Sequence, residues 1–283
     1  EIKMTNDNPE WRVFFNMLRC MYHNHPVKID IAGTVESIAE IDADLLYKCY
    51  YTFYNLNNMV LSVAGNITAD EVLAICDECL KPCEDKGLES VFPDEPETIV
   101  QSEIYEKQEV GTPIFHIGYK CRPASGEERL RKSMAASVAS SLLTDASSEM
   151  FRRLLIEGTI NSSFGSEVFV GDGFFSVIFS GESADPEKVR DSLCEEVDRI
   201  VREGISEKDF QRIRKSAYGL MVRDLNNVES VANLMINAHM EGVSPYDAVN
   251  VLSEMKCSDV YEFIRSELCR DRLVLSVIEG TDK

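Results

Sequence analysis

The feature that most constrains the fold of this chain is an internal repeat, in which short apolar motifs recur in the same order at a shift of 214 residues. The aligned pairs are Ile38–Ile41 with Leu252–Met255, Val60–Val63 with Val274–Val277, and His25 with His239. Three matches in one register are harder to produce by chance than one. The repeat predicts two related units, and it requires similar surroundings for Met59–Ala64 and Leu273–Ile278.

The two copies differ in what precedes them. The second copy has a long lead-in, from about residue 101 to about residue 215, whereas the first copy begins at Glu1 with no such segment. By symmetry, we expect a comparable segment to precede Glu1 in a longer protein.

A linker is predicted between the two copies. Residues 84–99 are acidic and contain two prolines and one glycine, a composition typical of extended linkers. The sequence therefore predicts the C-terminal part of a first unit at 1–83, a linker at 84–99 and a second unit at 100–283.

The second unit contains a clear order of strand and helix signals. Strands are expected at 102–110, 113–121, 160–170, 174–181 and 273–278, with helices at 127–143, 147–157, 186–203 and from Ser206 onward. Gly171-Asp172-Gly173 is a strong hairpin signal, and Asp185, Pro186 and Gly204 are typical helix start and stop residues. A few antiparallel strands covered by many helices indicate an α+β fold.

The first unit is predicted to have the same architecture, with its N-terminal part missing. Thr68-Ala69-Asp70-Glu71 is a capping box that begins a helix. Val60–Ala64 reads as a strand whose pairing partners would come before Glu1, so its exposed edge would invite dimerisation.

Net charge and apolar run length exclude two classes of partner. The formal net charge is −20, and both nucleic acids and anionic membranes require an excess of Lys and Arg. No apolar run approaches the length of about 20 residues that a membrane span needs. We expect no contact with nucleic acid or membrane.

The nine cysteines are scattered and odd in number, which favours reduced thiols and a cytoplasmic protein. Cys76, Cys79 and Cys83 have a spacing that suits metal ligands, but it also describes a buried stripe of a helix. No second Cys or His pair follows at zinc-finger spacing. The buried stripe is the favoured interpretation.

A series of motifs in the first part of the chain carries a family resemblance. The series is Glu1-Ile2-Lys3-Met4, Asp7-Asn8-Pro9, His25-Pro26, Ile31–Ile38 and Asn57–Ile67. It resembles the insulinase/pitrilysin family of zinc metallopeptidases, which carry an inverted H-x-x-E-H motif, and within it the bacterial processing-peptidase-like branch. The resemblance runs from Glu1 to about Gly280 and is most specific as far as Ile67.

The resemblance implies a clamshell of two similar α+β units around a peptide, the second of them non-catalytic. Two histidines of H-x-x-E-H and a downstream glutamate bind Zn²⁺ in the family, and the motif's own glutamate activates water. In this branch the downstream glutamate lies in a Glu-Ile-x-Met segment. The resemblance therefore makes Glu1 the candidate third zinc ligand of the intact protein, with Zn²⁺ as its cofactor and no metal expected in this chain alone.

The rest of the zinc motif is not found in the sequence. The four histidines are His23, His25, His116 and His239, and none form the i, i+4 pair that places two imidazoles on one helix face. His23 and His25 precede Pro26 at an expected helix exit, where surface or capping roles are favoured. The H-x-x-E-H motif is therefore expected before Glu1, and this chain alone is expected to be inactive.

A second departure concerns an Arg and a Tyr that active relatives place in the second unit, at R-x-x-x-G-x-x-Y spacing, to hold the substrate carbonyl. Anchored on Gly158, the Arg position is occupied by Leu154 and the Tyr position by Asn161. Arg152 and Arg153 lie nearby but out of register. Two explanations stay open: the protein uses a shifted arginine, or its second unit does not assist catalysis. This puts the peptidase activity of the intact protein in doubt.

Three functions are compatible with these observations. The first is a fragment of a zinc-dependent metalloendopeptidase that encloses and hydrolyses peptides or unfolded polypeptides. The second is a non-catalytic family member that acts as a scaffold or as the partner subunit, in a homo- or heterodimer, of an active peptidase. The third is an unrelated α+β binding module.

Overall fold

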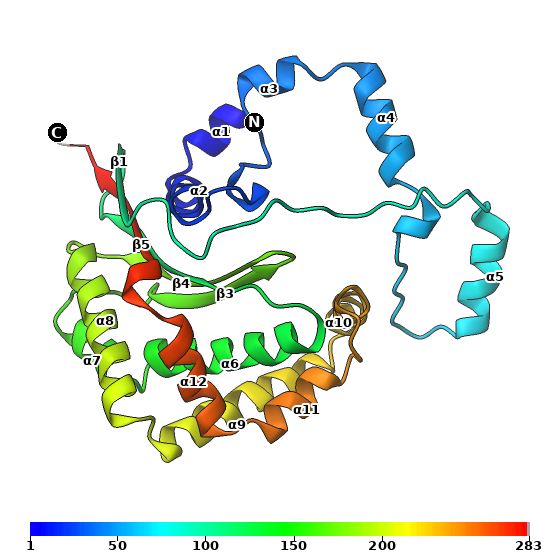
Figure 1. The fold of residues 1–283 in the computed structure, drawn as a ribbon. Helices are drawn as coiled ribbons and strands as arrows, with labels where there is room; N and C mark the ends of the chain where they lie inside the picture. Colours follow the sequence, from blue (N-terminus) through cyan, green and yellow to red (C-terminus); the bar gives the residue numbers. More distant parts are fainter. Residues whose placement is uncertain (282–283) are drawn as a thin grey trace.

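The described part of the chain, residues 1–281 of a computed structural model, contains twelve α-helices, three short 3₁₀ helices and five strands (Figure 1). The α-helices are α1 (Ile2–Asn6), α2 (Pro9–Met21), α3 (Val35–Ala39), α4 (Ala43–Phe53), α5 (Ala69–Cys79), α6 (Gly126–Thr144), α7 (Glu149–Ile156), α8 (Pro186–Glu203), α9 (Glu207–Asp224), α10 (Val228–Glu241), α11 (Asp247–Glu254) and α12 (Cys257–Glu267). The 3₁₀ helices are η1 (Pro26–Lys28), η2 (Leu56–Asn58) and η3 (Arg270–Arg272). The strands are β1 (Glu103–Gln108), β2 (Ile114–Cys121), β3 (Gly165–Gly171), β4 (Phe174–Glu182) and β5 (Leu273–Gly280).

All five strands belong to one sheet with the order β1-β5-β2-β4-β3. Only β1 and β5 are parallel, and the other neighbours are antiparallel. The strand that comes last in the sequence thus lies between β1 and β2. Together with the many helices, this sheet confirms the predicted α+β class.

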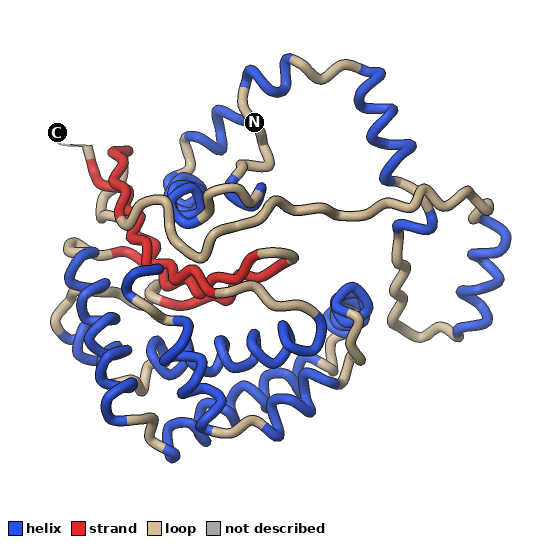
Figure 2. Tube along the Cα trace, in the orientation of Figure 1, coloured by secondary structure: helices blue, strands red, loops and turns tan. Residues whose placement is uncertain are grey.

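The two faces of the sheet are covered very differently (Figures 1 and 2). Helices α6 to α12 form a thick layer on one face, whereas α2 lies alone across the other. Alternate residues of β2 face the two layers in turn, because successive side chains of a strand point to opposite faces of the sheet. Phe115, Ile117 and Tyr119 enter the large core with the helical layer, whereas Gly118 lies under α2.

Local signals in the second unit produced the expected elements. The Asp185 side chain accepts a hydrogen bond from the Lys188 N–H at the start of α8, and Gly204 ends that helix with a φ of +85°. The β3–β4 hairpin turns at Asp172 and Gly173 as predicted, with Gly173 at a φ of +77°.

Strand β3 begins later than predicted, at Gly165 instead of Ile160. The side chain of Asn161 accepts the Ser163 N–H at 2.7 Å, and the Phe164 N–H bonds to the Asn161 carbonyl. This local turn uses backbone groups that a strand would need for pairing.

The predicted strand at Val60–Ala64 is wrong. Residues 59–64 have no regular secondary structure, and Leu61 is 66% exposed, whereas β5 is largely buried between β1 and β2. The similar surroundings that the repeat requires are therefore not found in the described residues. The physical reason is that no described strand lies beside residues 59–64 to exchange backbone hydrogen bonds with them.

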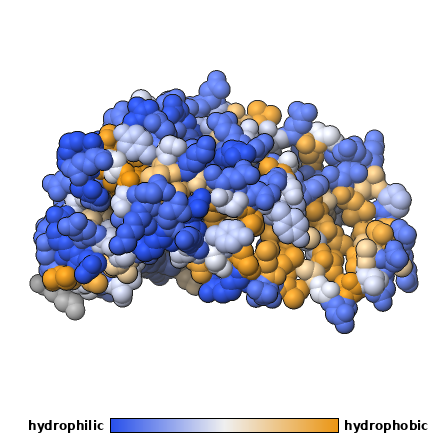
Figure 3. Space-filling view, turned by 90° about the horizontal axis from the view of Figure 1, so that it is seen from below, coloured by the Kyte–Doolittle hydropathy of each residue, from blue (hydrophilic) through white to orange (hydrophobic). Residues whose placement is uncertain are grey.

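The whole segment from α3 to the predicted linker exposes apolar side chains. Helices α4 and α5 have no buried residues, so the stripe of Cys76, Cys79 and Cys83 is not buried as predicted. Figure 3 shows apolar side chains gathered on the part of the molecule that lies to the right in Figure 1, where α4 and α5 are. Surfaces of this kind are typical of contact regions.

Helix α2 belongs by sequence to the predicted first unit, yet it packs against the sheet of the predicted second unit. The boundaries 1–83, 84–99 and 100–283 stay a prediction. Within the described residues, no helix combines the length and apolarity needed to cross a membrane.

Candidate functional site

The face of the sheet opposite the layer of α6 to α12 has a shape that fits α2. A Cβ atom on Gly118 would lie 2.0 Å from Met21 Cε and 2.6 Å from Met17 Sδ, so only glycine leaves room for these two buried side chains. Val274 and Ile178 complete the apolar contact on either side. The helix is thus seated on the sheet by shape and by apolar burial.

A row of polar side chains crosses the sheet beneath α2. His116 of β2 is opposite Ser180 of β4 and opposite Ser276 of β5. His116 is 9% exposed and Ser276 is fully buried. Neither His116 Nδ1 nor Ser276 Oγ has a hydrogen-bond partner among the described residues. Burial lowers the pKa of His116 to about 4, so the imidazole is neutral near pH 7.

Two carboxylates lie at one end of this row. Glu10 Oε2, in the first turn of α2, is 3.9 Å from His116 Nε2. Glu182, the last residue of β4, is opposite Ile114, two residues before His116 on the same face. Burial and the charge of Glu182 raise the pKa of Glu10. The side-chain amide of Asn161 donates to Glu182 Oε2 at 2.7 Å.

A buried ion pair lies at the other end of α2. Lys120 Nζ is 2.5 Å from Glu95 Oε1 and also donates to the carbonyls of Met21 and Thr98, each at 2.9 Å. Glu95 in turn accepts the backbone N–H groups of residues 23–25 at 2.7–2.8 Å. Burial by itself would raise the pKa of Glu95, but Lys120 and these three amides lower it to about 2. The pair joins the exit of α2, the predicted linker and the sheet.

His25 continues this connection to the hairpin and the helical layer. Its Nδ1 accepts the Val27 N–H at 3.1 Å, which confirms the predicted capping role, although the residue is buried and not on the surface. Its Nε2 lies 2.9 Å from the Asp172 carbonyl, and the Asp172 carboxylate pairs with buried Arg129 at 2.6 Å. Arg129 also pairs with Glu241 at the end of α10.

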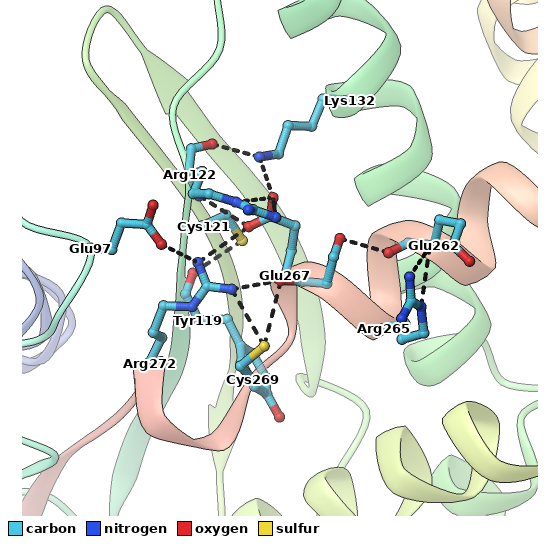
Figure 4. Close-up of polar contacts among 11 residues, drawn as sticks. Glu97, Tyr119, Cys121, Arg122, Lys132, Glu262, Arg265, Glu267, Cys269 and Arg272 are labelled. Carbon is cyan, nitrogen blue, oxygen red and sulfur yellow. Dashed lines mark hydrogen bonds and ion pairs between the residues drawn. The ribbon is translucent and has the colours of Figure 1, made fainter.

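Glu267, at the end of α12, is the centre of a second buried ionic group (Figure 4). Its carboxylate pairs with Lys132 Nζ at 2.7 Å, Arg122 Nη2 at 3.1 Å and Arg272 Nη1 at 3.5 Å. Burial alone would raise the pKa of Glu267, but Lys132 and the Arg122 backbone N–H hold it below its ordinary value. The group ties α12 to the residue that follows β2, to α6 and to η3.

Glu1, the candidate zinc ligand, is exposed at the N-cap position of α1, where its carbonyl accepts the Thr5 N–H. Among residues 1–281, no three His, Cys, Asp or Glu side chains are placed so that they could hold a metal ion together. Because catalytic zinc takes three protein ligands, Glu1 does not form such a centre with other described residues.

The two positions that active relatives fill with Arg and Tyr have different roles here. Leu154 is fully buried in the large core. Asn161 is exposed and bonds to Glu182. The structure thus brings Asn161, Glu182, Glu10 and His116 to one end of α2 and leaves Leu154 outside this group.

Glu10, Lys120, Glu95 and Glu182 were not predicted as site residues from the sequence. His116 and Lys120 are four positions apart in β2 and therefore lie on the same face, which was a signal that this face of the strand carries polar side chains. The partners of that row come from distant segments, and no spacing in the sequence indicates them.

Comparison with known proteins gives consistent matches. Residues 40–217 match the sequence profile of the family described as Peptidase M16 inactive domain. The chain is 32% identical to the zinc protease YmfH of Bacillus subtilis over 97% of its own length and 65% of that protein. It therefore spans just under two thirds of this relative.

Solved structures agree with these matches. An M16-like peptidase from Alicyclobacillus acidocaldarius superposes with a TM-score of 0.94 at 28% identity, over 99% of this chain and 68% of that one. A protease from Helicobacter pylori shares the fold with a TM-score of 0.84 at 15% identity, over 97% of this chain and 67% of that one.

Proposed function

Because the chain belongs to the peptidase M16 family, with its inactive domain matched over residues 40–217, we propose that it forms the non-catalytic half, and part of the first half, of a zinc-dependent metalloendopeptidase. In this role it supplies one wall of a compartment that encloses a peptide or an unfolded polypeptide. The observation that carries the proposal is the 32% identity to a zinc protease over 97% of the chain.

The zinc centre in this proposal lies mostly outside the 283 residues. We propose Glu1 as the third zinc ligand of the whole protein, with an H-x-x-E-H motif in the segment before it. When bound, zinc would polarise the peptide carbonyl and activate water. The part of the chain described here contributes the second unit and the helix α2 that joins it to the first.

The exposed apolar side chains of α3 to α5 fit this arrangement. We propose that they are covered in the whole protein by the remainder of the first unit, or by a related peptidase-like subunit in a homo- or heterodimer. The nine free cysteines suit a reducing compartment, and we propose the cytoplasm as the location.

A second candidate function is a non-catalytic subunit or scaffold that pairs with an active peptidase. Leu154 and Asn161 favour it, since they stand where the resemblance places an Arg and a Tyr that hold the substrate carbonyl. A buried Leu cannot donate a hydrogen bond, and the Asn161 amide donates one of its two N–H groups to Glu182.

The test compares this chain with the whole protein, using a quenched fluorescent peptide mixture in the presence of zinc or of a chelator. We expect chelator-sensitive cleavage by the whole protein and its loss in Glu1→Gln, with peptide binding but no cleavage by this chain. Binding without cleavage by the whole protein would select the second candidate. Chelator-sensitive cleavage by this chain alone would contradict both.

A further inference from the structure

Helix α10 carries an apolar stripe that is turned away from the helical layer. Val228, Val231 and Met235 follow one another at i, i+3 and i+7 spacing, so they lie along one face of the helix. Val228 is 55% exposed and Met235 is 41% exposed. Asn233 and Asn237, on the opposite face of α10, line a cavity that α6 and α9 also line. The three apolar residues are called the α10 stripe below.

The internal repeat relates the α10 stripe to α2. At the shift of 214 residues, Phe14, Met17 and Met21 of α2 align in order with the three residues of the stripe. These α2 side chains are the ones that face the sheet: Met17 and Met21 are fully buried, and both pack with Val274 of β5. Phe14 packs against the same cluster. The α10 stripe therefore occupies the positions of a helix face that covers a sheet, although it is exposed here.

The surface that α2 covers also has a counterpart in the first unit. Val274 of β5 aligns with Val60 at the same shift. Ser276, which lies on the same face of β5 as Val274, aligns with Ser62. The Oγ atoms of both serines are buried and have no hydrogen-bond partner among the described residues. The repeat thus indicates Val60 and Ser62 as the part of the first unit over which a helix should lie.

The relatives are long enough to supply the rest of that surface. The chain spans 65% of the zinc protease YmfH and 68% of the M16-like peptidase from Alicyclobacillus acidocaldarius, so about a third of each lies outside the match. Under the proposed function, the corresponding segment of this protein precedes Glu1. In the view of Figure 1, the segment between η2 and α5 lies on the side of α5 that faces α10. A completed first unit would meet α10 on that side.

We propose that the two units exchange helices. Helix α2 of the first unit covers the sheet of the second, and the α10 stripe in return covers the first unit at Val60, Ser62 and the segment before Glu1. The proposal rests on the part of the proposed function that places a first unit before Glu1. Because α2 covers a sheet of its own chain, the repeat places the partner of α10 in the same chain and not in a second copy. Each exchanged helix removes apolar side chains from water.

Photo-crosslinking in the whole protein tests the position of α10. The photoreactive residue p-benzoyl-phenylalanine replaces Met235 in the stripe or, as the matched control, Met240, which is 69% exposed on another face of the same helix. Mass spectrometry then identifies the crosslinked peptides. We expect position 235 to crosslink within its own chain to residues 59–64 or to the segment before Glu1, and position 240 to form no such crosslink.

Two results of this experiment would overturn the proposal. The first is that position 235 crosslinks to those peptides no more than position 240 does. The second is that position 235 crosslinks mainly to another molecule, which produces a band of twice the mass and identifies a second copy as the occupant.

Charged substitutions provide an independent measurement. In the whole protein, Met235→Lys should lower the melting temperature by about 3 °C or more, because it places a charge in an apolar contact. Met240→Lys should change it by about 1 °C or less, as is usual for a surface position. In this chain alone, both variants should behave like surface substitutions, since both side chains are exposed. Equal effects of the two variants in the whole protein would contradict the exchange.

The peptide cleavage assay separates this proposal from the proposed function. A whole protein that forms the crosslink at position 235 but cleaves no peptide in the presence of zinc contradicts the metalloendopeptidase function and supports the exchange of helices. Chelator-sensitive cleavage by a whole protein that does not form the crosslink overturns the exchange alone.

Discussion

Lys120 Nζ lies 2.5 Å from Glu95 Oε1, and both side chains are more than nine-tenths buried. The two residues come from different parts of the chain, since Glu95 belongs to the predicted linker and Lys120 to the central strand β2. Between them they bond to the end of α2 at Met21 and at the amides of residues 23–25. This contact holds α2 in place.

Removing the charge of Glu95 should therefore be strongly destabilising. Glu95→Gln leaves Lys120 buried without a counterion, and we expect a loss of about 3 kcal/mol or more in the free energy of unfolding, measured by urea denaturation. Glu97→Gln is the matched control, because this neighbouring carboxylate is exposed and contacts Arg272 only at 3.8 Å. Equal effects of the two variants would contradict the role of the buried pair.

His116 should make the stability of the chain depend on pH in the mildly acidic range. Its pKa is about 4 in the folded chain and 6.5 when unperturbed, so between these values the unfolded chain binds more protons. Stability is therefore retained above pH 6.5 and is lost as the pH falls towards 4, by up to about 3 kcal/mol.

The measurement is urea denaturation at a series of pH values. His116→Gln should flatten the dependence between pH 6.5 and 4, whereas His239→Gln, at an exposed position of α10, should keep it. Glu95 acts in a lower window: its folded pKa of about 2 is below its ordinary 4.5, so its contribution is lost only as the pH falls below about 4.5. A slope unchanged by His116→Gln would contradict the assignment.

Gly118 should resist even a single added methyl group. Gly118→Ala places a Cβ atom against the side chains of Met17 and Met21. Either these side chains must rotate or α2 must move, and we expect the free energy of unfolding to fall by about 1–3 kcal/mol. Gly219→Ala is the control, since nothing lies within 4 Å of its Cβ position in α9, and there the change should stabilise the chain by up to about 1 kcal/mol. Thermal unfolding measures both effects: we expect the melting temperature to fall in Gly118→Ala and to stay the same or rise in Gly219→Ala.

The exposed aromatic side chains of α4 should drive self-association. Tyr50 and Tyr54 stack on each other at 4.9 Å and are 54% and 68% exposed. Tyr50→Lys/Tyr54→Lys should weaken association by about fivefold or more, because it removes apolar area from the contact. Tyr218→Lys/Tyr246→Lys makes the same charge change elsewhere. Sedimentation at several concentrations measures the effect, and equal weakening by both pairs would indicate a response to charge alone.

Most elements of the second unit were predictable because their signals are local. Asp185 and Gly204 define the ends of α8 through hydrogen bonds and backbone angles within a few residues. Where the prediction failed, non-local pairing was decisive. Val60–Ala64 has the composition of a strand, but a strand requires a neighbour, and no described segment provides one.

The candidate site was predictable only in part. Asn161 was identified as the position of a missing Tyr, and the structure places it beside Glu182. The contribution of Glu10 was not foreseen, because an exposed glutamate in the first turn of a helix is usually explained by the helix dipole. Its proximity to His116 depends on how α2 lies across the sheet.

The sequence by itself determined the family, the α+β class and most of the helix and strand positions of the second unit, because these depend on motifs, hydrophobic periodicity and capping within short stretches of chain. Only the tertiary structure decided that α2 of the predicted first unit covers the sheet of the second, and that His116, Glu10 and Glu182 meet at its end. Such contacts join residues about a hundred or more positions apart, and their free energy depends on shape and burial, which a linear pattern does not specify.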